Sequence, residues 1–141
     1  MVDEVTRPYR HEGADRFAID GPALQLSPGV ALSLSMALHE LCTNAVKYGA
    51  LSNEAGQVAI SWETTRAPSG ATLRLRWQES GGPAVVEPAE RGFGTRLLER
   101  GIASELGGSV EIKYGASGLT CMIEAPVPAT PEESSTTLAA A

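Results

Sequence analysis

The segment His39–Ala50, HELCTNAVKYGA, sets three polar side chains of different chemistry into a helix that is otherwise apolar. Glu40, Asn44 and Lys47 recur at i, i+4 and i+7, so they share one helix face, with Tyr48 beside them. Apolar residues at the same spacing form a separate, core-facing stripe: Leu34, Leu38, Leu41 and Ala45. A carboxylate, an amide oxygen and a cation on one stripe suit a site that handles a metal-bound phosphate.

This helix has clear start and stop signals. Ser27 is placed to cap its N-terminus, and Pro28 suits the first helical position. The periodic pattern runs to about Tyr48, and Gly49 follows as a predicted C-terminal cap. The polar stripe therefore lies in the C-terminal half of the longest predicted element.

Shorter elements are predicted on both sides of the helix. Helical spacing favours a second helix at 95–106. Alternating residues favour strands at 16–20, 24–26, 57–64, 72–78, 109–114 and 119–125. The order β-β-α-β-β-loop-α-β-β predicts a mixed β-sheet with helices on one face, which is a two-layer α/β sandwich.

The chain is expected to contain one domain, because 141 residues give room for a single core. Residues 1–15 are polar and mixed, which is typical of a linker. Residues 129–141 are rich in Pro, Glu, Ser, Thr and Ala, so they are predicted to form a disordered tail with nothing to bury. The domain itself is predicted to span residues 16–128.

The bulk composition excludes several functions. Hydrophobic residues make up 43% and charged residues 20% of the chain, as in an ordinary globular domain. A net charge of −6 without a basic stripe argues against nucleic-acid binding. No apolar run approaches a membrane span and the N-terminus is not a signal peptide, so no membrane contact is expected. Cys42 and Cys121 are expected as buried thiols in a reducing cytoplasm, in preference to a disulfide.

Two segments after the long helix are further candidates for a site. Glu79 ends a predicted strand and enters the segment 80–83 (SGGP), where glycines allow close backbone approach; Trp77 shares its sheet face. In the segment 92–96 (GFGTR), glycines and the start of a helix suit phosphate oxygens. A Rossmann site is excluded, because position 97 is Leu and the strand-then-glycine order is missing.

Three motifs in this order resemble those of a known superfamily. The segment 39–50 resembles the N box of GHKL ATP-binding proteins, specifically that of the HWE group of bacterial sensor histidine kinases. The marks of this group are a histidine before the N-box glutamate and a Trp-x-Glu, here His39 and Trp77-Gln78-Glu79. The segment 92–98 (GFGTRLL) resembles the G2 box. The resemblance covers roughly Phe17 to Pro128 and implies the Bergerat ATP-binding fold.

The resemblance implies a role for each residue of the helix face. Glu40 would polarise the attacking phosphoacceptor, or a water near the γ-phosphate. The Asn44 oxygen would bind Mg²⁺, a hard cation that prefers oxygen ligands. Lys47 and Tyr48 would lie near the phosphates.

The resemblance also assigns the rest of the nucleotide site. Glu79 would accept a hydrogen bond from the adenine amine, and Thr120 would support this contact through a water. Further nucleotide contacts would come from the two glycine motifs: Gly81, Gly82, Gly92, Gly94, Thr95 and Arg96. For Arg96, a solvent-facing position fits the pattern equally well.

Neither histidine of the chain is expected to accept phosphate. His39 directly precedes the N-box glutamate, so an orienting role beside Glu40 is implied. A zinc site there would need a second histidine where the chain has Thr43. His11 lies in a polar segment without an amphipathic pattern. The phosphoacceptor is therefore expected on a helical domain upstream of the linker 1–15.

The implied function is that of the catalytic domain of a bacterial, cytoplasmic sensor histidine kinase. It would bind ATP and Mg²⁺ and transfer the γ-phosphate to the upstream helical domain, with a response regulator as an indirect partner. Alone, it is not expected to phosphorylate itself. The lid at 84–91 is short and lacks an F box. Two alternatives are a kinase-like docking module that no longer binds nucleotide, and a GHKL serine kinase of the anti-sigma type.

Overall fold

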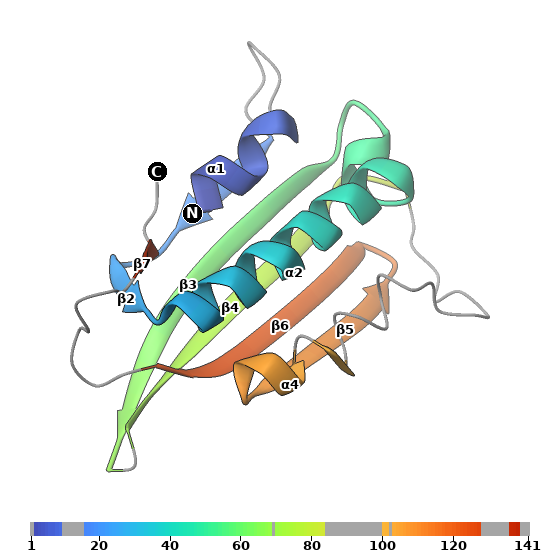
Figure 1. Ribbon diagram of the computed structural model, residues 1–141. Helices are drawn as coiled ribbons and strands as arrows, with labels where there is room; N and C mark the ends of the chain where they lie inside the picture. The colour runs from blue at the N-terminus through green and yellow to red at the C-terminus, as the bar shows by residue number, and fades with distance from the viewer. Residues whose placement is uncertain are drawn as a thin grey trace.

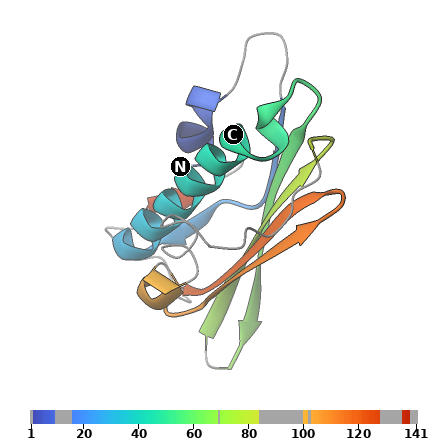
Figure 2. The ribbon, with the colours of Figure 1, turned by 90° about the vertical axis from the view of Figure 1, so that its right-hand side faces the viewer.

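The computed structural model of the protein has two layers, a five-stranded sheet and a layer of helices on one of its faces (Figures 1 and 2). The structure describes residues 2–9, 16–68, 70–83, 100–101, 103–127 and 136–138. The predicted two-layer α/β sandwich with a mixed sheet is confirmed.

The strands of the main sheet are β1 (Phe17–Asp20), β3 (Gln57–Ala67), β4 (Gly70–Ser80), β5 (Ser109–Gly115) and β6 (Gly118–Val127). Their order in the sheet is β1-β3-β4-β6-β5. β1 runs parallel to β3, and all other neighbours are antiparallel. The hairpin β3–β4 extends beyond the predicted strands, because backbone pairing continues through polar pairs such as Thr65 and Thr72.

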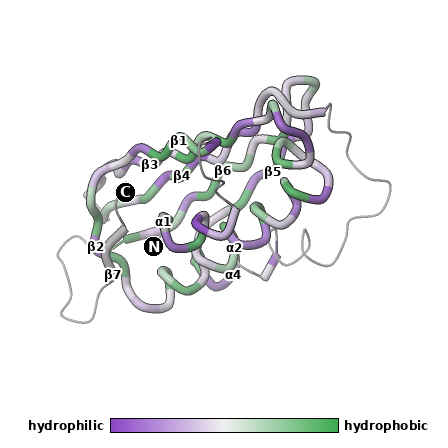
Figure 3. Tube along the Cα trace, turned by 90° about the horizontal axis from the view of Figure 1, so that it is seen from above, coloured by the Kyte–Doolittle hydropathy of each residue, from purple (hydrophilic) through white to green (hydrophobic). Residues whose placement is uncertain are grey.

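The strands alternate between a buried and an open face. In β4, Leu73, Leu75 and Trp77 are buried under the helices, whereas Arg74 and Arg76 are exposed. Figure 3 shows hydrophobic and hydrophilic residues alternating along the strands. The sheet therefore has one face for the core and one for solvent.

The long helix α2 (Pro28–Lys47) lies over the buried face of the sheet (Figure 1). Ser27 caps it as predicted, since its hydroxyl accepts a hydrogen bond from the Val30 N–H (3.4 Å). Tyr48 is the C-cap, and Gly49 is already the N-cap of the 3-10 helix η2 (Ala50–Ser52), so the predicted cap at Gly49 is one residue off. The predicted core stripe is confirmed, with four buried members: Leu34, Leu38, Leu41 and Ala45.

The second predicted helix is described only at its end. The helix α4 (Ala103–Leu106) contacts α2 and buries Leu106. It ends before Gly107, which takes a positive φ of 68°, a conformation that favours glycine. None of the described helices is long and apolar enough to cross a membrane.

Both flanks of the domain make contacts that the sequence does not predict. The helix α1 (Val2–Thr6) packs against α2 and leads into the 3-10 helix η1 (Arg7–Tyr9); Val2 and Thr6 are fully buried. At the other end, β7 (Thr136–Leu138) pairs antiparallel with β2 (Leu24–Leu26). Three residues of the segment predicted as a tail therefore pair with β2, whose backbone groups offer them hydrogen-bond partners. That residues 1–15 lead from an upstream domain stays a prediction.

The two cysteines are free and buried, as predicted. Cys42 lies on α2 and Cys121 on β6. Burial raises the pKa of each thiol to about 12, so both stay protonated at neutral pH.

Candidate functional site

One face of α2 carries three polar side chains in successive turns. Glu40 and Asn44 are half-buried and Lys47 is exposed, while Tyr48 at the helix end is 71% exposed. Among the described residues, none forms a hydrogen bond or ion pair with the side chains of Glu40, Asn44 or Lys47. A carboxylate, an amide and an ammonium group are thus available to a ligand on this face, as their spacing predicts.

His39 lies beside this face and contacts Tyr9, a residue that the sequence analysis missed. The two ring centroids are 6.4 Å apart, and the ring planes are tilted by 57°. Burial raises the pKa of Tyr9 and the Cys42 thiol adds to this shift, so the phenol is neutral at physiological pH. Within the described part of the chain, no hydrogen bond joins the His39 and Glu40 side chains. The implied orienting role of His39 stays a prediction.

Glu79 lies at the end of the buried face of β4 and is only 3% exposed. Its two oxygens accept hydrogen bonds from different elements: Oε1 from the Ala50 N–H (2.8 Å), and Oε2 from the Trp77 indole N–H (3.0 Å). Burial raises the pKa of Glu79, while these two hydrogen bonds act in the opposite direction. Since a carboxylate oxygen can accept two hydrogen bonds, each oxygen keeps one acceptor position.

Glycines bring several backbone segments close to Glu79. A methyl group on Gly49 would overlap Oε1 of Glu79, and one on Gly82 would lie 2.5 Å from a Cα of η2. Gly118 has a φ of 136° and leaves no room for a side chain beside the Glu79 carbonyl. The close approach predicted for Gly81 and Gly82 is made here by the chain's own backbone, and their contact with a nucleotide stays a prediction.

The loop between η2 and β3 is held by Arg16, which no local sequence pattern marks. Its guanidinium donates to the carbonyl oxygens of Ala50 (2.7 Å), Asn53 (2.5 Å) and Gly56 (2.7 Å). The Asn53 side chain accepts from two backbone N–H groups of the same loop (2.8 and 3.1 Å). Ala50, which donates to Glu79, is therefore held at its carbonyl as well as at its N–H.

Thr120 lies on the open face of the sheet, whereas Glu79 lies on the buried face. In the antiparallel register, Thr120 lies opposite Gln78 on β4 and Lys113 on β5. Residues directly opposite one another share a sheet face, and Gln78 is on the open face whereas Glu79 is on the buried face. Thr120 and Glu79 therefore lie on opposite faces of the sheet, and the support of Thr120 for the adenine contact stays a prediction. The physical reason for the opposite faces is the two-residue period of a strand, in which neighbouring side chains point to opposite faces.

The predicted phosphate end of the site falls partly outside the described residues. This applies to Gly92, Gly94, Thr95 and Arg96. What the structure describes of the site is the face of α2 and the surroundings of Glu79.

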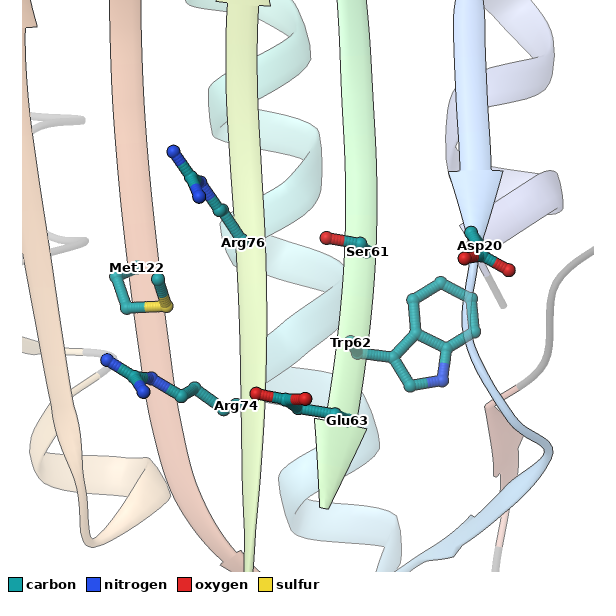
Figure 4. A pocket seen from close by; sticks show the side chains of 7 residues that line it. All are labelled: Asp20, Ser61, Trp62, Glu63, Arg74, Arg76 and Met122. Carbon is teal, nitrogen blue, oxygen red and sulfur yellow. The ribbon is translucent and has the colours of Figure 1, made fainter. Parts of the chain in front are cut away.

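A hollow on the open face of the sheet lies apart from these residues (Figure 4). Charged side chains line it, with Asp20 on β1, Glu63 on β3, and Arg74 and Arg76 on β4. The hollow and Glu79 lie on opposite faces of the sheet, so one small ligand cannot contact both.

The chain is similar in sequence to curated histidine kinases, although no protein-family model matches it. It is 45% identical over 125 residues to a protein named blue-light-activated histidine kinase from Brucella ovis, and 43% identical over 129 residues to one from Brucella anthropi. These matches cover 89% and 92% of the chain, but only 25% and 26% of the relatives. The chain thus spans about a quarter of the length of the curated relatives it matches.

Solved structures of histidine kinases have the same fold. The Erythrobacter litoralis EL346 blue-light activated histidine kinase matches with a TM-score of 0.72 at 20% identity, over 89% of this chain and 39% of that chain. The catalytic domain of histidine kinase ThkA matches with a TM-score of 0.61 at 19% identity, over 93% of this chain and 92% of that chain. The chain is thus similar in sequence to part of the curated histidine kinases, and it shares its fold with solved histidine kinase catalytic domains.

Proposed function

We propose that the chain binds Mg²⁺-ATP as the catalytic domain of a sensor histidine kinase of the HWE group. It passes the γ-phosphate to a histidine on a helical domain outside the chain. The observation that carries this proposal is the face of α2, where Glu40, Asn44 and Lys47 have side chains without partners among the described residues. Phosphoryl transfer depends mainly on positioning and electrostatic stabilisation, and these three groups can supply both.

Glu79 fits the adenine end of the nucleotide. A carboxylate offers only acceptors, so its remaining positions suit the exocyclic amine of adenine and oppose the carbonyl of guanine. The group is buried beside η2, where water competes little for hydrogen bonds. An unpaired buried polar group costs about 1–3 kcal/mol, so ATP should be preferred to GTP by about ten- to a hundred-fold.

Asn44 fits a magnesium ion that is held mainly by the nucleotide. Mg²⁺ commonly keeps several waters and binds substrate phosphates together with only one or two protein oxygens. No three His, Cys, Asp or Glu side chains lie together in the described parts of the chain, so no cage of such ligands competes for the ion there. The Asn44 oxygen would hold the ion, which when bound neutralises charge on the phosphates, and Lys47 would add a second positive charge.

Glu40 is the proposed catalytic residue. It lies one turn before Asn44 and polarises the attacking histidine, or a water near the γ-phosphate. His39, in contact with Tyr9, flanks it and orients it. Tyr48 and, outside the described residues, the second glycine motif complete the nucleotide contacts: Gly92, Gly94, Thr95 and Arg96.

The partners follow from the same proposal. The phosphoacceptor lies on a helical domain to which α1 leads, and a response regulator receives the phosphate from that domain. Buried free thiols at Cys42 and Cys121 support a reducing compartment such as the bacterial cytoplasm.

A nucleotide titration with and without Mg²⁺ tests the proposed function. We expect ATP to bind more tightly with Mg²⁺, and more tightly than GTP. Incubation with γ-labelled ATP should leave no acid-labile label on the chain alone. Failure to bind any nucleotide would favour the docking module, and stable label on His39 would identify α2 as a phosphoacceptor helix instead.

A further inference from the structure

Trp77 connects the core with the candidate nucleotide site. Its side chain is fully buried, and its ring meets that of Phe17 edge-on, with the centroids 6.4 Å apart. The indole N–H, the one polar group of this side chain, donates to Oε2 of Glu79 (3.0 Å). A core residue therefore directs its single donor at the proposed adenine acceptor.

A second tryptophan shows that a buried indole does not need a carboxylate. Trp62 is 4% exposed, and its N–H donates to the backbone carbonyl of Pro22 (2.7 Å). A neutral acceptor thus satisfies the indole, and a glutamine oxygen at position 79 would do the same. Burying a carboxylate costs more than burying an amide. The needs of Trp77 alone do not explain the charge at Glu79. A carboxylate, unlike an amide, accepts from Trp77 and Ala50 on separate oxygens and still keeps acceptor positions for a ligand that donates.

The two donors around Glu79 fix the orientation of its carboxylate. The Ala50 N–H engages Oε1 and the Trp77 N–H engages Oε2, so rotation of the group would break at least one of these bonds. One acceptor position on each oxygen is then held in a constant direction. We propose that Trp77 is a positioning residue for adenine recognition, orienting the Glu79 carboxylate toward the exocyclic amine. This inference rests on the adenine role proposed for Glu79.

The same hydrogen bond favours the ionised carboxylate, which is the form that accepts from an amine. Burial raises the pKa of Glu79, and the hydrogen bonds from Ala50 and Trp77 oppose this. Of the neighbouring groups, the Cys42 thiol has a pKa of about 12 and stays neutral, and Arg16 binds the loop at the Ala50 carbonyl. Loss of the indole N–H should raise the pKa of Glu79 further, so that protonation sets in at a higher pH.

The test compares Trp77→Phe with the matched control Trp62→Phe. Each variant loses one buried indole hydrogen bond, so both should lower the unfolding temperature. In titrations from mildly acidic to mildly alkaline pH, Trp77→Phe should lose about ten-fold in ATP affinity, because only this variant loses a hydrogen bond to a charged group. GTP affinity should change little, and the loss for ATP should deepen at acidic pH. Trp62→Phe should bind both nucleotides as the unchanged chain does.

If Trp77→Phe does not fold, a side chain closer in size to tryptophan can replace it in the test. Benzothienylalanine at position 77 keeps the size of the ring and replaces the N–H by sulfur, so the same loss of ATP preference is expected. Equal ATP affinity in the position-77 and position-62 variants would refute the positioning role, and so would a parallel loss for ATP and GTP at every pH. If the unchanged chain does not distinguish ATP from GTP, the adenine role of Glu79 fails, and this inference fails with it.

Discussion

The two ends of the candidate site are built in opposite ways. On α2, the side chains of Glu40, Asn44 and Lys47 have no hydrogen-bond or ion-pair partners within the described residues. At the end of β4, Glu79 is buried and held by Trp77 and Ala50. The first end can adapt to a ligand that brings its own charge and metal, whereas the second is formed before the ligand arrives. This difference between the two ends suits a reaction in which the adenine ring is only recognised, while the phosphate groups change their charge.

The largest effect is expected at the open end, at Glu40. In a longer protein that joins this chain to its phosphoacceptor domain, Glu40→Gln should slow phosphorylation by about a hundred-fold or more, as expected for loss of a general base. ATP affinity should hardly change. The rate is measured with γ-labelled ATP and the affinity by titration, with the exposed Glu63→Gln as the matched control. If rate and affinity fall together, Glu40 serves binding and not the transfer step.

A smaller effect is expected at Asn44. Asn44→Ala should weaken Mg²⁺-ATP binding by about ten- to a hundred-fold, because loss of a metal contact has effects of this size. Metal-free ADP should bind almost as before. The control on the same helix is Ser35→Ala, which removes a half-buried hydroxyl that donates to the Ala31 carbonyl (2.9 Å). Equal losses with and without metal would mean general damage to the site and would reject Asn44 as a ligand.

The sequence predicts those features that depend on residues close to one another along the chain. The polar face of α2 and its core stripe follow from helical spacing, and the common face of Trp77 and Glu79 follows from the two-residue period of a strand. The fold class follows from the order of these elements. The structure confirms each of these predictions.

What depends on contacts between distant segments could not be predicted. Arg16 binds carbonyl groups 34 to 40 positions away, Tyr9 meets His39, and β7 pairs with β2, but no local pattern marks these contacts. The burial of Glu79 under the η2 loop is of the same kind. The sheet face of Thr120 is a related case, since it depends on the register between β6 and β4, which the sequence does not define.

A smaller effect is expected at Arg16, which holds the loop beside Glu79 without contacting Glu79 itself. Arg16→Gln should remove hydrogen bonds to three carbonyl groups of the loop and lower the free energy of unfolding by about 1–3 kcal/mol. ATP affinity should fall less, because the Trp77 hydrogen bond remains. Denaturant titrations measure the stability, and the exposed Arg76→Gln should stay within about 0.5 kcal/mol of the unchanged chain. If the two arginine variants unfold alike, other contacts hold the loop.

The smallest effect is expected at Thr120. Thr120→Val exchanges a hydroxyl for a methyl group on the face of the sheet opposite Glu79, so ATP affinity and the preference over GTP should not change. Stability should stay within about 0.5 kcal/mol, as for a surface substitution. Glu79→Gln in the same titration is the positive control, since an amide can pair with either base and should lose the preference. A clear loss of ATP affinity in a folded Thr120→Val would instead support the water-mediated adenine contact that the resemblance implies for this hydroxyl.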